Sequence, residues 1–411
     1  MPDVTVLDVL LHGRSIGTLT QLGGDRNLFA FTEDYINDAQ RATLSLSFKD
    51  PLGELITDIN PTRTRVAPFF ANLLPEGPLR TYLAERARAN EKRDFYLLWV
   101  LGQDLPGAII IRPAEGEPWP PNDDREDDDR HVDNHHDTLR FSLAGVQLKF
   151  SVVMEANGGL TIPAQGVGGS WIIKLPSTKY DGVPENEFAM MTLARHIGID
   201  VPEVQLHSLD EIAGLPEGIG RLEGHALAVR RFDRSDGGPV HIEDFAQIFG
   251  VYPERKYSRA SYRNIAKVIW IETGEEGLTE YIRRLIFNAL IGNADMHLKN
   301  WSLIYPDQHN PALSPGYDFV ATIAFLPDEK MALNFGRSKK WTDISMDELR
   351  YFAGKAELPE TLVIDTAVET VALFHEKWNK EKKHLPLTTE TIRIIEKHAN
   401  AIPLVRHTRR R

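Results

Sequence analysis

The most informative stretch of this 411-residue chain is Ile291-Gly292-Asn293-Ala294-Asp295-Met296-His297-Leu298-Lys299-Asn300. Before it, apolar residues recur at three- and four-residue spacing, which predicts a buried helix. Gly292 is a natural end for such a helix, so the residues after it are expected on a loop. This loop carries a carboxylate, an imidazole, an ammonium and a carboxamide, from Asp295, His297, Lys299 and Asn300. We interpret this group as catalytic.

The spacing within this loop indicates phosphoryl transfer. Asp295 and Asn300 stand five residues apart, as do the catalytic base and the metal-binding asparagine in the catalytic loop of protein kinases. A second carboxylate, Asp318, follows in the sequence Tyr317-Asp318-Phe319. Mg²⁺ that bridges nucleotide phosphates needs hard oxygen ligands, which Asn300 and Asp318 supply. We therefore predict a site for ATP and Mg²⁺, in which Asp295 accepts the proton of an acceptor hydroxyl.

Length and composition are those of an ordinary globular protein. A chain of 411 residues is expected to form two or three domains. No run of apolar residues is long enough to cross a membrane, and the N-terminus lacks the basic and apolar regions of a signal peptide. The absence of cysteine excludes disulfides, thiolate metal sites and a cysteine nucleophile. These features predict a cytoplasmic protein without a membrane partner.

The net charge of −12 is concentrated in one segment. Between Glu115 and Asp137, ten carboxylates stand against two arginines, a net of eight of the twelve negative charges. Such a composition cannot bury enough apolar surface to order itself, so residues 114–138 are predicted to be a flexible linker. His131, His135 and His136 lie among these aspartates, and metal binding is the alternative interpretation.

The hydrophobic pattern divides the rest of the chain into three parts. Residues 1–113 predict an N-terminal β-rich subdomain, with a hairpin around His12-Gly13-Arg14 and strand-like alternation from Leu44 to Phe48. Residues 139–240 predict a nucleotide-binding region made largely of strands, and residues 241–411 a mainly helical C-terminal catalytic lobe. We therefore expect an α+β protein with two lobes.

Lys174 interrupts an otherwise apolar predicted strand, Trp171–Pro176. A lysine on an edge strand often does no more than extend its ammonium to solvent. Here it lies between a glycine-rich stretch, 166–169, and a predicted helix that carries Glu187. This placement favours a contact of Lys174 with the α- and β-phosphates of a nucleotide, with Glu187 as its partner.

A loop of small residues, Ser142-Leu143-Ala144-Gly145-Val146-Gln147-Leu148-Lys149, precedes another predicted strand. Its Ala144-Gly145 pair would let backbone N–H groups approach phosphate oxygens. The pattern G-x-x-x-x-G-K-[ST] is absent, and an ordinary turn before a strand is the alternative.

Taken together, these motifs resemble the HipA family of serine/threonine kinase toxins from bacterial toxin–antitoxin systems. Their order and spacing over most of the chain carry the resemblance. The motifs are Asn72–Gly77, Ser142–Gln147, Ile173–Pro176, Asn186-Glu187, Arg231–Arg234, Glu243–Gln247, Ile291–Asn300 and Tyr317-Asp318.

The resemblance implies a two-lobed, protein-kinase-like fold with an added N-terminal β-rich subdomain. By this resemblance, Asp295 is the catalytic base and Lys174 binds the ATP phosphates. Asn300 and Asp318 are the implied ligands of Mg²⁺. The implied phosphate loop consists of Ala144, Gly145, Val146, Gln147, Leu148 and Lys149. The implied adenine hinge consists of Arg230, Arg231 and Phe232.

The resemblance also implies regulation and partners. Ser142 matches the serine at which the family inactivates itself by autophosphorylation. The implied partners are a HipB-like helix-turn-helix antitoxin and, through that complex, operator DNA. The implied protein substrate is an aminoacyl-tRNA synthetase, notably glutamate–tRNA ligase, whose modification halts translation and favours persistence.

Two other functions are compatible with the residues. A metal-dependent phosphoesterase would use Asp295 and His297 as ligands, but it needs further histidines at ligand spacing, and His225, His241 and His407 do not provide them. A non-catalytic co-repressor would keep the fold only to hold its antitoxin. DNA contact is a separate interpretation of the basic C-terminus, although a solvated face is the more common role of such charges.

Overall fold

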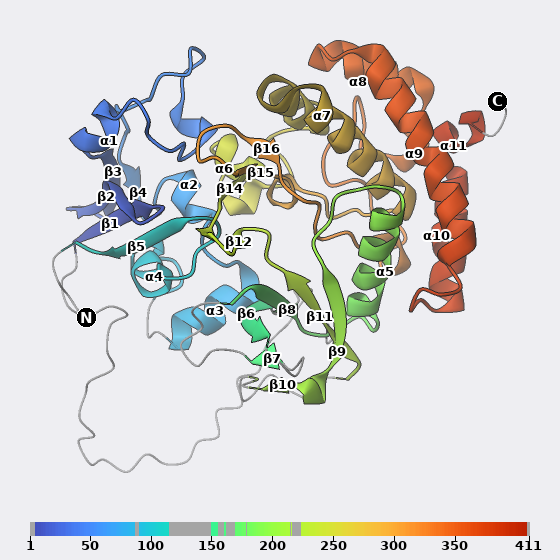
Figure 1. Ribbon diagram of the computed structural model, residues 1–411, viewed down its shortest axis with the longest axis horizontal. Helices are drawn as coiled ribbons and strands as arrows, with labels where there is room; N and C mark the ends of the chain where they lie inside the picture. The colour runs from blue at the N-terminus through green and yellow to red at the C-terminus, as the bar shows by residue number, and fades with distance from the viewer. Residues whose placement is uncertain are drawn as a thin grey trace.

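The computed structural model describes residues 5–86, 90–114, 149–154, 160–161, 169–177, 179–213, 215 and 223–408. The predicted linker beyond residue 114, and Ser142 to Leu148 of the predicted phosphate loop, lie outside the described residues. Within the described chain, an N-terminal unit, a middle sheet and a helical C-terminal part follow one another from left to right in Figure 1.

The N-terminal unit is built on a five-stranded antiparallel sheet in the order β4-β3-β2-β1-β5. Its strands are β1 Val6–Leu11, β2 Arg14–Leu22, β3 Arg26–Phe31, β4 Thr62–Arg63 and β5 Ile109–Pro113. The predicted hairpin is confirmed, because Leu11 pairs with Arg14 across the two residues His12 and Gly13, both of which have positive φ angles. Helices α1 Glu33–Asn37, α2 Pro68–Ala71, α3 Gly77–Arg86 and α4 Asp94–Leu101 complete this unit.

The predicted strand from Leu44 to Phe48 is wrong, since this segment forms a 3₁₀ helix, η1 Leu46–Phe48. Side chains satisfy its backbone donors instead of a neighbouring strand. The Leu46 N–H donates to the Glu243 carboxylate at 3.0 Å, and the Ser47 N–H donates to the Ser45 hydroxyl at 3.0 Å. Ser45 in turn donates to Glu243 at 2.5 Å. The alternation of polar and apolar residues therefore reflects a capped turn.

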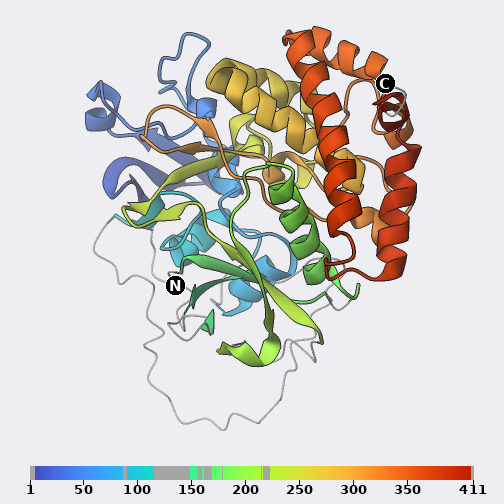
Figure 2. The same cartoon turned by 45° about the vertical axis from the view of Figure 1, so that its right-hand side comes forward.

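The middle sheet has six strands in the order β10-β7-β6-β8-β11-β9. They are β6 Lys149–Met154, β7 Leu160–Thr161, β8 Trp171–Lys174, β9 Val204–Ser208, β10 Ile212–Ala213 and β11 His225–Arg230, with η2 Leu209–Glu211 between β9 and β10. Helix α5 Val183–His196 packs on one face, between this sheet and the C-terminal helices (Figures 1 and 2). Leu227 faces α5, and Lys174 pairs directly with it in β8. Because directly paired residues share a face of the sheet, Lys174 points toward α5.

The C-terminal part begins after the hairpin of β12 Arg234–Ser235 and β13 Gly238–Pro239. It contains a small sheet of β14 His241–Asp244, β15 Ser302–Tyr305 and β16 Ala312–Leu313, which the sequence reasoning did not anticipate. Its helices are α6 Phe245–Ile248, α7 Tyr262–Ile291, α8 Met346–Ala356, α9 Glu360–Glu381, α10 Thr389–Ala401 and α11 Pro403–Thr408. Short 3₁₀ turns are η3 Pro253–Arg255, η4 Leu298–Asn300, η5 Thr322–Ala324 and η6 Trp341–Asp343.

Helix α7 delivers the loop on which the prediction of function rests. It begins at a capping box of Ser261 and Asn264 and ends at Gly292, where φ is +70°. A Cβ atom at position 292 would lie 2.7 Å from the side chain of Ile323, so both the backbone conformation and the available space require glycine. The predicted helix end is confirmed.

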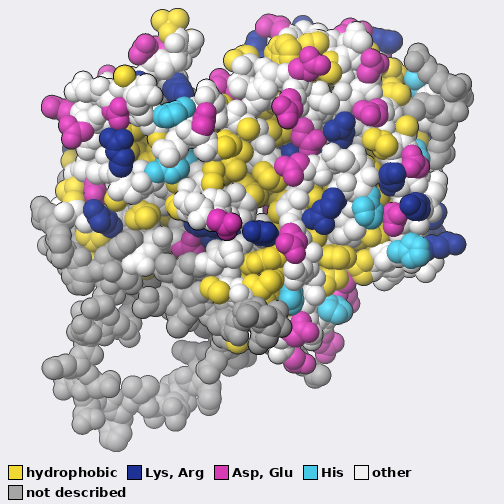
Figure 3. All heavy atoms as spheres, in the orientation of Figure 1, with side chains coloured by type: hydrophobic (Ala, Val, Ile, Leu, Met, Phe, Trp, Pro, Cys, Tyr) yellow, Lys and Arg dark blue, Asp and Glu magenta, His cyan; other side chains and the backbone are white. Residues whose placement is uncertain are grey.

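Three of the C-terminal lysines lie next to glutamates, so they do not form the concentrated basic surface that the sequence suggested. Lys377 lies 2.7 Å from Glu376, Lys380 lies 3.9 Å from Glu381, and Lys382 pairs with Glu396. Figure 3 shows acidic and basic side chains interspersed over this part of the visible face. None of the described helices is long and apolar enough to cross a bilayer.

Candidate active site

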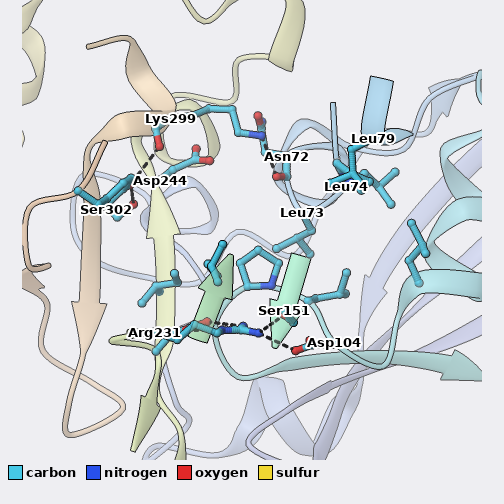
Figure 4. Close-up of a pocket in the computed structure, with 18 of the residues that line it drawn as sticks. Asn72, Leu73, Leu74, Leu79, Asp104, Ser151, Arg231, Asp244, Lys299 and Ser302 are labelled. Atoms are coloured by element: carbon cyan, nitrogen blue, oxygen red, sulfur yellow. Dashed lines mark hydrogen bonds and ion pairs between the residues drawn. The ribbon is translucent and has the colours of Figure 1, made fainter. Parts of the chain in front are cut away.

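A cavity of about 560 Å³ lies where the three parts of the chain meet (Figure 4). This volume falls within the usual range of small-molecule sites. Its lining includes Asn72, Leu73, Leu74, Leu79 and Asp104 from the N-terminal unit, Ser151, Ile172, Lys174, Val229, Arg230, Arg231 and Phe232 from and beside the middle sheet, and Asp244, Lys299, Ser302, Tyr317 and Asp318 from the C-terminal part. Several predicted site residues that lie far apart in the sequence therefore share one cavity, whereas three residues of the predicted catalytic loop are not among its lining residues, namely Asp295, His297 and Asn300.

Lys174 joins the middle sheet to the C-terminal part. Its ammonium donates hydrogen bonds to the carboxylates of Glu187, on α5, and of Asp318. The lysine side chain is only 6% exposed. Burial alone would lower the pKa of Lys174, but the charges of Asp318 and Glu187 outweigh it and raise the pKa, so the ammonium stays charged. The structure thus brings Lys174 to the partner that the sequence suggested, and it excludes the solvent-exposed alternative.

Asp318 occupies an unusual backbone conformation. Its φ is +57°, in the left-handed region that non-glycine residues seldom adopt. The side-chain amide of Asn293 donates to the carbonyl oxygen of Asp318 at 3.1 Å and so holds this conformation. Residues held in this region concentrate at functional sites.

Asn300 is buried at the end of η4 and is not among the residues that line the cavity. Its side-chain N–H donates to the backbone carbonyl of Asp295 at 2.8 Å, which fixes the orientation of the amide. The amide oxygen is the atom of Asn300 that could bind a metal. Mg²⁺ usually takes one or two protein oxygen ligands and completes its shell with water and phosphate. The carboxylate of Asp318 and the amide oxygen of Asn300 fit that requirement. Among the described residues, no group of three or more His, Asp and Glu side chains is placed to hold a metal ion.

Asp295 lies at the open side of the loop, with 55% of its side chain exposed. Its carboxylate accepts a hydrogen bond of 2.5 Å from the hydroxyl of Tyr257, a contact that the sequence reasoning missed. His297 is buried, and its Nε2 lies 3.9 Å from Asp295 Oδ1. Burial and the charge of Lys256 lower the pKa of His297 to about 3, so the imidazole is neutral. A catalytic role for His297 stays a prediction.

Lys299 points toward the N-terminal unit. Its ammonium lies 2.8 Å from the carboxylate of Glu76 and donates to the carbonyl of Asn72 at 3.1 Å. Lys256 binds the same Glu76 at 2.9 Å. Burial would raise the pKa of Glu76, but Lys299 and Lys256 outweigh it and lower the pKa to about 2. In the sequence, Glu76 lies within the motif Asn72–Gly77, which assigns it no role of its own.

The three predicted hinge residues differ in what they contact. Arg230 is exposed at the end of β11, 3.9 Å from Glu203. Arg231 is buried and binds Asp233 and Asp104, each at 2.9 Å, which ties the middle sheet to the N-terminal unit. Its guanidinium is therefore already engaged in a structural network. The ring of Phe232 packs on that of Tyr317, with 5.6 Å between centroids.

Asp244, which lies within the motif Glu243–Gln247 but has no predicted role, also lines the cavity. It caps α6 by accepting from the Gln247 N–H at 2.8 Å. Burial raises its pKa to about 6, although the charge of Lys299 acts in the opposite direction.

Of the predicted phosphate loop, only Lys149 lies within the described residues. It opens β6, and its backbone pairs with that of Lys174 in β8. The chain therefore enters the strand next to the lysine that is predicted to hold phosphates. Ser142, Ala144, Gly145, Val146, Gln147 and Leu148 lie outside the described residues.

Two family models match this chain over most of its length. The HipA N-terminal domain matches residues 7–112, and the HipA-like C-terminal domain matches residues 141–378. The chain belongs to the HipA family. The resemblance seen in the sequence motifs is thereby confirmed.

Similar proteins support the same assignment of this HipA-family chain. Y4dM of Sinorhizobium fredii, whose name proposes a kinase, is 57% identical over 99% of both chains. The serine/threonine-protein kinase toxin HipA of Shewanella oneidensis is 27% identical, over 84% of this chain and 82% of that protein.

A solved structure of another protein has a fold similar to that of this HipA-family chain. It is the complex of Shewanella oneidensis HipA with HipB and operator DNA, with a TM-score of 0.73 and 22% identity over 98% of this chain and 97% of that one. At this identity, the structural likeness shows the fold alone. It confirms the expected α+β fold with a helical C-terminal part.

Proposed function

We propose that this HipA-family protein is a serine/threonine protein kinase that transfers the γ-phosphate of ATP to a protein acceptor. One observation carries the proposal, namely the contact of Lys174 with Asp318. This contact joins the lysine predicted to hold phosphates, on the middle sheet, to the carboxylate predicted to hold metal, on the C-terminal part. Both side chains line the same cavity. Names of similar proteins that refer to kinases point to the same activity.

The chemistry follows from the side chains that line the cavity and from Asp295 and Asn300, which lie on the same loop as the lining residue Lys299. Lys174, kept charged and in place by Glu187, would contact the α- and β-phosphates. Asn300 and Asp318 would hold Mg²⁺. The bound ion would neutralise part of the negative charge of the phosphates. Asp295 would accept the proton of the acceptor hydroxyl. Lys299 lies in the same cavity, where its positive charge favours a phosphate.

The test is ADP formation from Mg-ATP, together with the mass of phosphorylated protein. Asp295→Asn is expected to slow transfer by a factor of about 10²–10⁴, because the base is lost while the size of the side chain is kept. Asp236→Asn, in the exposed turn between β12 and β13, is the matched control and is expected to retain full activity. Equal rates for the wild type and Asp295→Asn would refute the proposal. Release of phosphate from monoesters instead of transfer would indicate a phosphoesterase.

Growth arrest separates a kinase toxin from a non-catalytic co-repressor. If transfer is the basis of toxicity, expression of the wild type arrests growth and expression of Asp295→Asn does not. Equal toxicity of the two proteins would show that growth arrest does not depend on catalysis.

The partners proposed are a HipB-like antitoxin, operator DNA bound through it, and a cytoplasmic protein substrate. The first two are supported by the content of the similar solved complex. An aminoacyl-tRNA synthetase such as glutamate–tRNA ligase is the substrate class that the family resemblance suggests. A phosphoproteome comparison of cells that express the wild type or Asp295→Asn would identify the substrate.

Autophosphorylation at Ser142 is the final part of the proposal. The serine matches the family motif, although it lies outside the described residues. Intact-mass measurement after incubation with Mg-ATP is expected to show one added phosphate in the wild type and none in Asp295→Asn. Substitution of Ser142 by alanine should remove that species.

A further inference from the structure

The hydroxyl of Tyr257 donates to Asp295 Oδ1 at 2.5 Å. A general base must lie within about 2.6–3.2 Å of the hydroxyl from which it takes a proton. Tyr257 therefore presents to Asp295 the same chemical group, at close to the same distance, that the acceptor side chain must present during transfer. Both groups cannot occupy that oxygen in the same way at the same time.

The backbone and the ring of Tyr257 are anchored independently of this hydrogen bond. Lys339 donates to the carbonyl of Tyr257 at 3.0 Å. The ring meets that of His297 edge to face, with 4.9 Å between centroids. The preceding carbonyl, of Lys256, accepts from the Leu298 N–H at 3.3 Å. Two backbone contacts and one ring contact therefore hold Tyr257 beside this loop without the help of its hydroxyl.

The segment that carries Tyr257 is also tied to the N-terminal unit. Lys256 binds Glu76 at 2.9 Å, and Glu254 binds Arg65 at 2.5 Å. The hydroxyl of Tyr252 donates to the carbonyl of Val66 at 3.1 Å. These contacts hold residues 252–257 across the loop that bears Asp295.

Tyr257 acts in this contact as a hydrogen-bond donor. Burial and the negative charge of Asp295 raise the pKa of its phenol, so the proton stays on the tyrosine oxygen. The pair nevertheless faces solvent, because 41% of Tyr257 and 55% of the Asp295 side chain are exposed. A segment of another protein can therefore reach Asp295 once the phenol turns aside.

We propose that Tyr257 marks the acceptor subsite, with its hydroxyl occupying the place at Asp295 that the acceptor serine or threonine hydroxyl takes during transfer. The inference rests on the proposed kinase function. Tyr257 has to turn aside for the acceptor hydroxyl to take this place at Oδ1, so it is a positioning residue that restrains transfer in the resting protein. A water molecule that serves as the acceptor has to take the same place at Asp295 Oδ1.

The test uses Tyr257→Phe in the full chain, with Mg-ATP as the only added ligand. This change removes the hydroxyl and keeps the ring against His297. Formation of ADP reports transfer to every acceptor, protein or water. The rate is expected to rise about three- to tenfold with an unchanged KM for ATP, since a hydrogen bond to a charged group is strong but this one is partly exposed. Tyr351→Phe, whose ring lies 3.9 Å from the guanidinium of Arg337, is the matched control and should not change the rate.

The outcomes separate the inference from the proposed function. A slower or unchanged rate in Tyr257→Phe, with an active wild type and an inactive Asp295→Asn, overturns the acceptor subsite and leaves the kinase intact. Equal rates in the wild type and Asp295→Asn overturn the kinase itself. A gain in Tyr257→Phe that disappears in the double variant with Asp295→Asn supports the inference, because the gain then depends on the base. Matching thermal unfolding curves establish that the variants are folded.

Discussion

The carboxylate of Glu76 lies 2.8 Å from the ammonium of Lys299, so the N-terminal unit directly contacts the loop that carries Asp295. The same carboxylate binds Lys256, next to Tyr257. One acidic side chain therefore connects the N-terminal unit to both sides of the candidate active site.

Glu76→Gln is expected to slow ADP formation roughly 5- to 30-fold, which corresponds to about 1–2 kcal/mol. The reason is that neutralising Glu76 releases Lys299 from its position beside the cavity. Glu390→Gln removes an exposed ion pair with Arg393 within α10, away from this interface, and it serves as the control. Full activity of Glu76→Gln would show that Lys299 needs no such support.

The Glu76 contacts also predict a dependence of stability on pH. The pKa of Glu76 is lowered to about 2 in the folded protein, from an ordinary value of 4.5. A lowered pKa means that the stabilisation is fully present above pH 4.5 and is lost as the pH falls toward 2. The difference in melting temperature between the wild type and Glu76→Gln should therefore shrink between pH 5 and pH 3. A constant difference over this range would contradict the assignment.

Lys174→Met should destabilise the protein by about 3–5 kcal/mol, because it removes the cation between the carboxylates of Glu187 and Asp318. Urea unfolding followed by circular dichroism measures the change. Adding Glu187→Gln to Lys174→Met should recover part of the loss, since one of the two negative charges is then removed. If Lys174→Met unfolds like the wild type, the ion pairs do not hold the two parts together.

Glu243 predicts a dependence of stability on pH that is opposite in sign to that of Glu76. Burial raises its pKa to about 7, despite hydrogen bonds from Ser45, Tyr305 and the Leu46 N–H. A carboxyl group with a raised pKa binds its proton more tightly in the folded state, so stability falls as the pH rises from 4.5 to 7. Glu243→Gln mimics the protonated form and should gain stability relative to the wild type between pH 5 and pH 8. Melting temperatures that change in parallel would contradict this expectation.

Features set by neighbouring residues could be predicted from the sequence. The hairpin at His12-Gly13 and the end of α7 at Gly292 depend on local backbone conformation, and both are confirmed. The pairing of Lys174 with Glu187 was also within reach, because a strand followed by a helix brings such residues together.

Contacts between distant segments could not be predicted in this way. The contacts of Glu76 with Lys299 and of Tyr257 with Asp295 depend on how separate units pack, and no local pattern reports that packing. The segment from Leu44 to Phe48 was misread for the same reason, since Glu243, far along the chain, supplies its hydrogen bonds. The domain boundaries at residues 113, 138 and 240, and the catalytic roles of Asp295, His297 and Lys299, stay predictions.

The shared lining of the cavity has a consequence for inhibitor design. Leu73, Leu74 and Leu79 come from the N-terminal unit, whereas Lys174 and Asp318 come from the parts proposed to bind ATP. A compound that fills the whole cavity must match both surfaces at once. An ATP mimic extended toward these leucines would gain selectivity from a wall that kinases without such a unit do not possess.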